Sequence, residues 1–426
     1  MSLFVILLFL CLALLGMPLA FSLGVSALAG LMVAGFDLSI LSTRLMNSVN
    51  SFPLMSIPLF MVTGELMLKA GIMDRLVDLA NAFIGRVRGG LAQVAIIAGA
   101  GLASVSGAAV ADASALSSTL VPSLKKQYGL GFSSGIVAAA ANLGPIIPPS
   151  GAMIVYAFMA GSSVSVGGMF MAGVLPGLLL FLTLMGLCWL ISWWRDYPIS
   201  GQRVTLSNIL HQMRRNLIIF MMPVGVIGGI VFGAFTPTEG AAIGCCYALL
   251  LGFFVTKQLK IRDLPEVLLT AAKTTAVVGA MIAFASTVTF LFTIDMLPFK
   301  LAALLQGLTD SPFVFMCLIA LMLLVVGMFL ESNAAYIMLV PLFHPIALQY
   351  GIDPLHFGFV FVLNLVIGML TPPVGVILFV VCGITKVEMG TLVRESWPFI
   401  VAMYVLLLLC MIFPGIVTTL PHAMGY

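Results

Sequence analysis

The feature that most constrains this chain is a stretch without any ionised side chain, residues 127–194, which is 68 residues long. A bilayer core about 30 Å thick is crossed by roughly 20 apolar helical residues, so this stretch holds at least two membrane passes. Over all 426 residues only 8% are Asp, Glu, Lys or Arg, against about 25% in soluble domains. This composition excludes a water-soluble fold. It predicts an all-α polytopic membrane protein, with residues 1–426 forming a single membrane-embedded unit.

Helix-breaking and polar residues interrupt the middle of the same stretch, namely Asn142, Gly144, Pro145, Pro148, Pro149 and Gly151. Proline cannot donate a helical hydrogen bond, and its ring clashes with the preceding turn. Backbone opened at membrane depth is tolerated only where protein or a watery cavity covers it. The interruption therefore indicates a binding site inside the membrane.

Simpler passes are predicted at residues 3–22, 51–68, 90–104, 170–194, 217–235, 240–256, 274–294, 311–330 and 397–417. Segments 108–124 and 332–349 are short or interrupted, and we predict that they are re-entrant or broken. Basic residues flank the two passes between 217 and 256 on both sides, which predicts a cytoplasmic loop at 195–216.

A net charge of +3, scattered along the chain, favours no nucleic-acid partner.

The two halves of the chain carry similar motifs in the same order. Each half has a Val-Pro pair, a Tyr-Gly pair, an Asn-Leu pair and a Pro-Pro pair, which are Val121-Pro122, Tyr128-Gly129, Asn142-Leu143 and Pro148-Pro149 in the first half and Val340-Pro341, Tyr350-Gly351, Asn364-Leu365 and Pro372-Pro373 in the second. Duplicated segments, each with an interrupted helix, are typical of secondary transporters with inverted repeats. The alternative is chance similarity, because Gly, Ala and Leu are common here.

A broken helix offers unpaired N–H groups where one half-helix starts and unpaired carbonyls where the other ends. Carbonyls suit Na+, and N–H groups suit a carboxylate. Polar residues precede each break, with Ser104 and Ser106 in the first half and Ser332 and Asn333 in the second. Their hydroxyl and amide oxygens are hard donors appropriate for an alkali cation. The alternative is that such residues bond to their own helix or allow close helix packing.

Intramembrane acids are candidates for function because burying their charge is expensive. Asp112 and Glu331 occupy equivalent positions of the repeat, and the alternative for both is an acid at a helix N-terminus. Glu65 and Glu239 lie nearer the ends of passes, where we expect them to cap helices. We expect His344 to be a hydrogen-bonded structural histidine rather than a proton relay.

No enzyme motif is present: there is no His-Glu-x-x-His pair, no Gly-rich phosphate loop followed by Lys, and no nucleophile with triad partners. We expect no enzymatic activity and no cofactor beyond a coupling ion. The same absence excludes ATP-driven pumping by this chain. The energy for transport must come from an ion gradient or from another chain.

Four motifs resemble the large membrane subunit of TRAP (tripartite ATP-independent periplasmic) transporters. They are Gly101-Leu102-Ala103-Ser104-Val105-Ser106-Gly107 continuing to Asp112, Asn142-Leu143-Gly144-Pro145-Ile146-Ile147-Pro148-Pro149-Ser150, Phe235-Thr236-Pro237-Thr238-Glu239-Gly240-Ala241-Ala242, and Ile367-Gly368-Met369-Leu370-Thr371-Pro372-Pro373-Val374-Gly375. The resemblance covers nearly the whole chain. It implies a Na+-coupled importer of an organic acid in a bacterial inner membrane, with a separate small four-helix membrane subunit and a periplasmic substrate-binding protein as partners.

The resemblance also implies an elevator-type fold in which two re-entrant hairpins and two broken helices move against a scaffold. The moving halves would be residues 90–170 and 311–390. The implied substrate- and ion-binding residues are Ser104, Ser106, Asn142, Gly144, Pro145, Glu331, Ser332, Asn333, Asn364, Gly368, Thr371 and Pro372. Na+ itself would contact Ser104, Ser106, Gly144, Asn333, Gly368 and Thr371.

Two other functions fit the sequence. A self-sufficient Na+/dicarboxylate symporter of the wider ion-transporter superfamily would transport without partners, and a channel would conduct. Paired broken helices in a repeat favour alternating access over a standing pore.

Overall fold

The computed structural model describes residues 1–84, 87–200 and 205–426. In these residues the regular structure is helical, apart from a short antiparallel pairing of β1 (Val87–Arg88) with β2 (Ile199–Ser200). The predicted all-α class is therefore confirmed.

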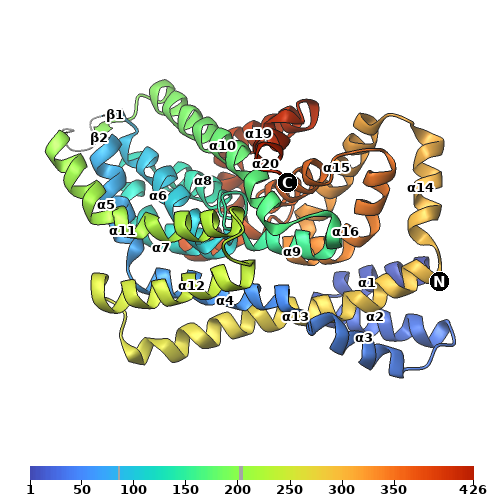
Figure 1. Ribbon diagram of the computed structural model, residues 1–426. Helices are drawn as coiled ribbons and strands as arrows, with labels where there is room; N and C mark the ends of the chain where they lie inside the picture. Colours follow the sequence, from blue (N-terminus) through green and yellow to red (C-terminus); the bar gives the residue numbers. More distant parts are fainter. Residues whose placement is uncertain (85–86, 201–204) are drawn as a thin grey trace.

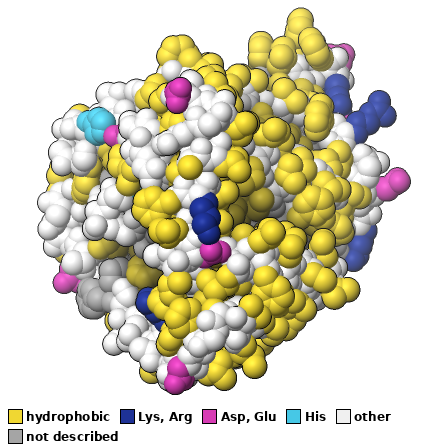
Figure 2. Space-filling view, turned by 90° about the vertical axis from the view of Figure 1, so that its right-hand side faces the viewer, with side chains coloured by type: hydrophobic (Ala, Val, Ile, Leu, Met, Phe, Trp, Pro, Cys, Tyr) yellow, Lys and Arg dark blue, Asp and Glu magenta, His cyan; other side chains and the backbone are white. Residues whose placement is uncertain are grey.

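Long apolar helices dominate the chain. Among the described residues, six helices are long and apolar enough to cross a membrane, or seven if the bent pair α4 (Ser56–Lys69) and α5 (Ile72–Ile84) forms one span. Figure 2 shows one face, on which hydrophobic side chains form broad continuous areas and charged side chains are few. Such a surface is suited to lipid rather than to water.

An outer layer of helices lies along one side of the molecule in Figure 1. In it α4 packs against both α12 and α13, and α13 continues along α2 and α3. The layer consists of α4 together with α1 (Ser2–Leu14), α2 (Leu19–Val33), α3 (Ser39–Val49), the 3-10 turn η1 (Phe52–Met55), α12 (Pro237–Leu250), the π-helical turn η3 (Leu251–Thr256), the 3-10 turn η4 (Ile261–Asp263) and α13 (Leu264–Ile294).

Glu239 caps α12, as the sequence predicts. The Thr236 Oγ1 atom accepts a hydrogen bond from the Glu239 backbone N–H at 3.3 Å, and Glu239 Oε2 accepts one from the Thr236 backbone N–H at 2.8 Å. This reciprocal pair satisfies two backbone donors at the start of the helix.

The remaining helices form a central bundle in which the same sequence of elements occurs twice. The first copy contains α6 (Gly90–Ser106), α7 (Ala109–Tyr128), α8 (Leu130–Ala141), α9 (Gly151–Ala160), the 3-10 turn η2 (Gly161–Ser163) and α10 (Val166–Trp194). The second contains α15 (Pro312–Phe329), α16 (Ser332–Gln349), α17 (Pro354–Gly368), α18 (Val376–Thr385) and α19 (Met389–Ile412). Connecting helices are α5, α11 (Leu206–Val231) and α14 (Leu297–Leu308), and α20 (Gly415–Ala423) ends the chain.

Each copy has one helix hairpin and one interrupted helix. The chain turns at residues 107–108 between α6 and α7 and at 330–331 between α15 and α16, which we call turn 1 and turn 2. The helical segments α8 and α9 are separated by residues 142–150, and α17 and α18 by residues 369–375, which we call break 1 and break 2. Both Pro-Pro pairs lie in these breaks, as the sequence predicts.

The two copies interleave rather than stand apart. After its break, each interrupted helix packs against the hairpin of the other copy: α9 contacts α16, and α18 contacts α7. Before its break, each packs against the last helix of the other copy, since α8 contacts α19 and α17 contacts α10. Both hairpins and both breaks therefore meet in one place.

Three sequence predictions need correction. The single pass at 3–22 is wrong, because the chain bends at Gly16 (φ +85°) and Pro18 into two helices, each too short to cross a bilayer alone. For segments 108–124 and 332–349 the broken alternative is wrong, since α7 and α16 continue through their internal prolines, and the re-entrant alternative stays a prediction. The proposed loop 195–216 is helical from Leu206 onward, and its residues 201–204 lie outside the described residues.

Candidate functional site

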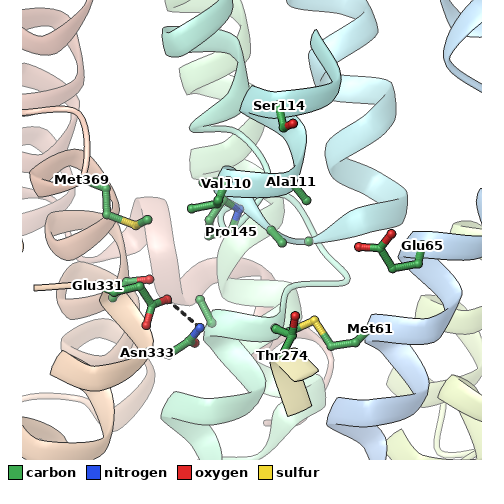
Figure 3. Close-up of a pocket in the computed structure, with 16 residues that line it drawn as sticks. Met61, Glu65, Val110, Ala111, Ser114, Pro145, Thr274, Glu331, Asn333 and Met369 are labelled. Carbon is green, nitrogen blue, oxygen red and sulfur yellow. Dashed lines mark hydrogen bonds between the residues drawn. The ribbon is translucent and has the colours of Figure 1, made fainter. Parts of the chain in front are cut away.

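The hairpin turns and the breaks surround a cavity of about 320 Å³ (Figure 3). The first copy contributes turn 1 and the start of α7, with Ser114 one turn further on, and also Pro145 of break 1 and the start of α9. The second copy contributes Met369 of break 2 and the residues around turn 2. The outer layer contributes Met61 and Glu65 from α4 and Thr274 from α13.

Turn 1 is held tightly against break 1. Gly107 has a φ of +62°, and a Cβ at this position would lie 2.6 Å from the Pro149 carbonyl oxygen. Only glycine allows both this backbone conformation and this approach. The tip of the first hairpin is therefore fixed on the opened backbone of its own copy.

A buried carboxylate lies behind turn 1. Asp112 is 0% exposed, and its Oδ1 accepts a hydrogen bond from the Ser106 hydroxyl. Its Oδ2 has no hydrogen-bond partner among the described residues and faces Gly144, where an added Cβ would collide with it. Buried polar atoms are usually paired, so a free carboxylate oxygen beside an opened helix is a candidate ligand for a cation.

The end of α15, just before turn 2, meets the end of α17 and break 2 in a similar way. Gly327 of α15 and Gly368 of α17 touch backbone to backbone, since a Cβ on Gly368 would lie 2.7 Å from the Gly327 Cα. The Gly375 N–H donates to the Met328 carbonyl at 3.1 Å. Just after turn 2, the Asn333 amide at the start of α16 donates to Glu331 Oε1 at 2.8 Å, and both side chains line the cavity.

The breaks are stabilised by local hydroxyl groups. Ser150 caps α9, accepting a hydrogen bond from the Met153 N–H at 3.3 Å and donating one to the Pro145 carbonyl. In break 2 the Thr371 hydroxyl donates to the Ile367 carbonyl at 2.9 Å and lies 3.3 Å from the Tyr404 hydroxyl.

Three helices start at the cavity. Residues 109–111 of α7, 151–152 of α9 and 332–333 of α16 line it, and all belong to first helical turns. The N–H groups of a first turn have no intrahelical partners and carry partial positive charge. The arrangement combines backbone N–H groups of a kind that suits an anion with carboxylates and carbonyls of a kind that suits a cation.

The structure brings some predicted site residues into the cavity and leaves others outside it. Pro145, Glu331, Ser332 and Asn333 line the cavity. Ser106 and Gly144 lie directly behind it, on either side of Asp112. The others are outside its lining, namely Ser104, Asn142, Asn364, Gly368, Thr371 and Pro372.

Several of the residues outside the lining have structural contacts. The Ser104 hydroxyl donates to the Gly101 carbonyl of its own helix at 2.7 Å. The amide of Asn142 donates to Met403 Sδ, and that of Asn364 to the Ala320 carbonyl at 2.7 Å.

Sequence reasoning missed Met61, Thr274 and Met369, and it assigned Glu65 to helix capping. That assignment is wrong, because Glu65 lies inside α4 and faces the cavity. No short motif marks these residues, since they reach the cavity only through packing of the outer layer. The expectation that His344 is hydrogen-bonded is confirmed: its two ring nitrogens lie 2.9 Å from the Tyr156 hydroxyl and 2.8 Å from the Ser163 hydroxyl.

Membrane-length helices, a duplicated bundle and two interrupted helices around a polar cavity define the architecture of a secondary transporter. A solved transporter, YdaH of Alcanivorax borkumensis, has a similar fold, with a TM-score of 0.62 over 89% of each chain at 17% identity. Residues 5–416 match the family model described as "Tripartite ATP-independent periplasmic transporter, DctM component", and the chain belongs to this family.

Two relatives cover almost the whole chain. The C4-dicarboxylate TRAP transporter large permease protein DctM of Pseudomonas aeruginosa is 36% identical over 406 residues, which are 95% of this chain and 94% of that protein. The sialic acid TRAP transporter large permease protein SiaM of Vibrio cholerae is 36% identical over 417 residues, 96% of each. The chain is thus a multi-pass inner-membrane permease component and not an enzyme.

Proposed function

We propose that this chain is the large membrane subunit of a Na+-coupled importer that takes an organic acid from a periplasmic binding protein and works with a small membrane subunit. The observation that carries the proposal is the convergence of two hairpin turns and two helix breaks on one polar cavity. The family description makes the chain one component of a tripartite system. The relatives' names specify a C4-dicarboxylate and sialic acid, and both are organic acids.

Two Na+ positions would use oxygen donors that line the cavity or lie directly behind its lining. The first lies between turn 1 and break 1, where Asp112 Oδ2, the Ser106 hydroxyl and carbonyls near Gly144 are close together. The second would lie between turn 2 and break 2, where Glu331 and Asn333 line the cavity together with Met369, and the carbonyls near Gly368 and Thr371 would complete it. Backbone carbonyls and carboxylates replace the hydration shell of an alkali cation without binding it irreversibly.

The substrate carboxylate would bind at the starts of α9 and α16, whose first-turn residues line the cavity. The two copies of the bundle, residues 90–170 and 311–390, would move together as an elevator, with re-entrant hairpins as gates. The interleaving of the copies supports this motion, because α9 is packed on α16 and α18 on α7. The outer layer would be the scaffold.

Reconstitution into lipid vesicles tests the proposal. The chain together with its two partners should take up organic acid only when a Na+ gradient is imposed, and the chain alone should take up none. Uptake by the complete set without Na+ would reject Na+ coupling. Na+-driven uptake by the chain alone would instead support the self-sufficient symporter.

A further inference from the structure

The charges that line the cavity are unbalanced. Glu65 of α4 and Glu331 of turn 2 both line it, and in Figure 3 their carboxylates enter from opposite sides. Among the described lining residues none is Lys, Arg or His. An organic acid entering this space therefore meets two carboxylates, balanced only by the partial charges of helix starts.

No hydrogen bond or ion pair among the described residues explains the position of the Glu65 carboxylate. Glu65 lies in the C-terminal half of α4, half-buried, and within the described residues it makes no hydrogen bond or ion pair. The nearest cation along the helix, Lys69, is bonded to Glu266 at 2.9 Å and does not line the cavity. Asp112 is bonded to Ser106 and is also outside the lining. Because Lys69 is bonded to Glu266, no ion pair neutralises the charge of Glu65, and this charge also acts on whatever occupies the cavity.

We infer that Glu65 is a charge-selectivity residue, which favours Na+ in the cavity and opposes the negative charge of the solute. The inference rests on the proposed function and extends it to substrate class. A fixed carboxylate changes the binding energy of each ligand in proportion to that ligand's charge. The cavity consequently favours a singly charged acid over a doubly charged acid of similar shape. It also favours sets of bound ligands in which the number of Na+ ions exceeds the negative charge of the acid.

The inference predicts that removing the charge of Glu65 changes the affinity for Na+ and the affinity for an organic acid in opposite directions. Glu65→Gln removes the charge while keeping the shape. It should weaken Na+ binding about fivefold and tighten a monocarboxylate about fivefold, which is about 1 kcal/mol per charge. The affinity for a dicarboxylate should rise about 25-fold, because a dicarboxylate carries two charges. Loss of a Na+ ligand alone would weaken Na+ binding without tightening the acids, and a purely structural defect would weaken all three ligands together.

Binding is measured on the complete transporter in lipid nanodiscs, from the shift of the unfolding midpoint. The protein is titrated with Na+ alone, and then in saturating Na+ with matched mono- and dicarboxylates of equal carbon number. Glu65→Asp keeps the charge and should restore the wild-type affinities. Asp78→Asn removes an exposed carboxylate on α5 that does not line the cavity, so it should change neither affinity.

A second variant covers the case in which Glu65→Gln does not insert. Thr274→Asp adds a carboxylate at the same cavity from the exposed face of α13 and should tighten Na+ and weaken the acids. Affinities that are unchanged, or that all move in one direction, would overturn the inference while leaving Na+ coupling intact. If neither Na+ nor any carboxylate shifts the wild-type midpoint, the proposed function fails and the inference fails with it.

Discussion

The contact between Gly327 and Gly368 offers the sharpest test of how the second hairpin is held on its interrupted helix. A Cβ added at Gly368 would lie 2.7 Å from Gly327 Cα and 2.9 Å from Gly327 C. Both are backbone atoms, so no side-chain rotation relieves the collision. For Gly368→Ala, α15 and α17 must separate by about 1 Å to reach ordinary carbon–carbon contact distances.

The expected loss of stability follows from two opposing effects. Forcing an extra methyl group into a packed interface costs about 1–3 kcal/mol. Replacing glycine by alanine near a helix end returns up to about 1 kcal/mol. We therefore expect Gly368→Ala to lower the free energy of unfolding by about 1–2 kcal/mol. Separation of α15 from α17 also displaces turn 2, so the Na+ concentration for half-maximal uptake should rise.

Thermal unfolding in detergent measures the first effect, and uptake into vesicles measures the second. Gly383→Ala is the matched control, because Gly383 lies in α18 of the same interrupted helix and an added Cβ meets nothing within 4 Å. The control should unfold at the wild-type temperature or above it. If Gly368→Ala behaves like the control, the two helices are not in backbone contact and the reasoning is refuted.

Two further predictions concern single polar groups. Ser106→Ala and Asn333→Ala should each raise the Na+ concentration for half-maximal uptake by roughly 10- to 150-fold, the equivalent of about 1.5–3 kcal/mol for one donor to a charged group. Ser123→Ala, away from both turns, should leave it unchanged, and equal Na+ dependence in all three variants would place the ion sites elsewhere. Thr236→Ala removes the side-chain cap that bonds to the Glu239 N–H. It should lower the free energy of unfolding by about 1 kcal/mol without changing Na+ dependence, as thermal unfolding and uptake would show.

The properties that the sequence alone determined are local ones. Scarcity of charge identifies a membrane protein because ionised groups cannot be buried in lipid at low cost. The pairs Pro148-Pro149 and Pro372-Pro373 locate both breaks, because proline lacks the N–H that a continuing helix needs. The sequence motifs also indicated the order of elements in the repeat and the family to which the chain belongs. The boundary between the predicted segments 311–330 and 332–349 falls at turn 2 in the structure.

The tertiary structure decided which side of each helix meets the cavity. Many helices here are apolar on all sides, so the sequence pattern does not reveal which face is inward. Glu65 and Thr274 face the cavity because the outer layer packs α4 and α13 beside it. Asn142 and Asn364 lie in matching positions of the repeat but bond to other helices. Which half-helix packs on which hairpin depends on contacts between residues far apart in the chain, and no local pattern encodes those contacts.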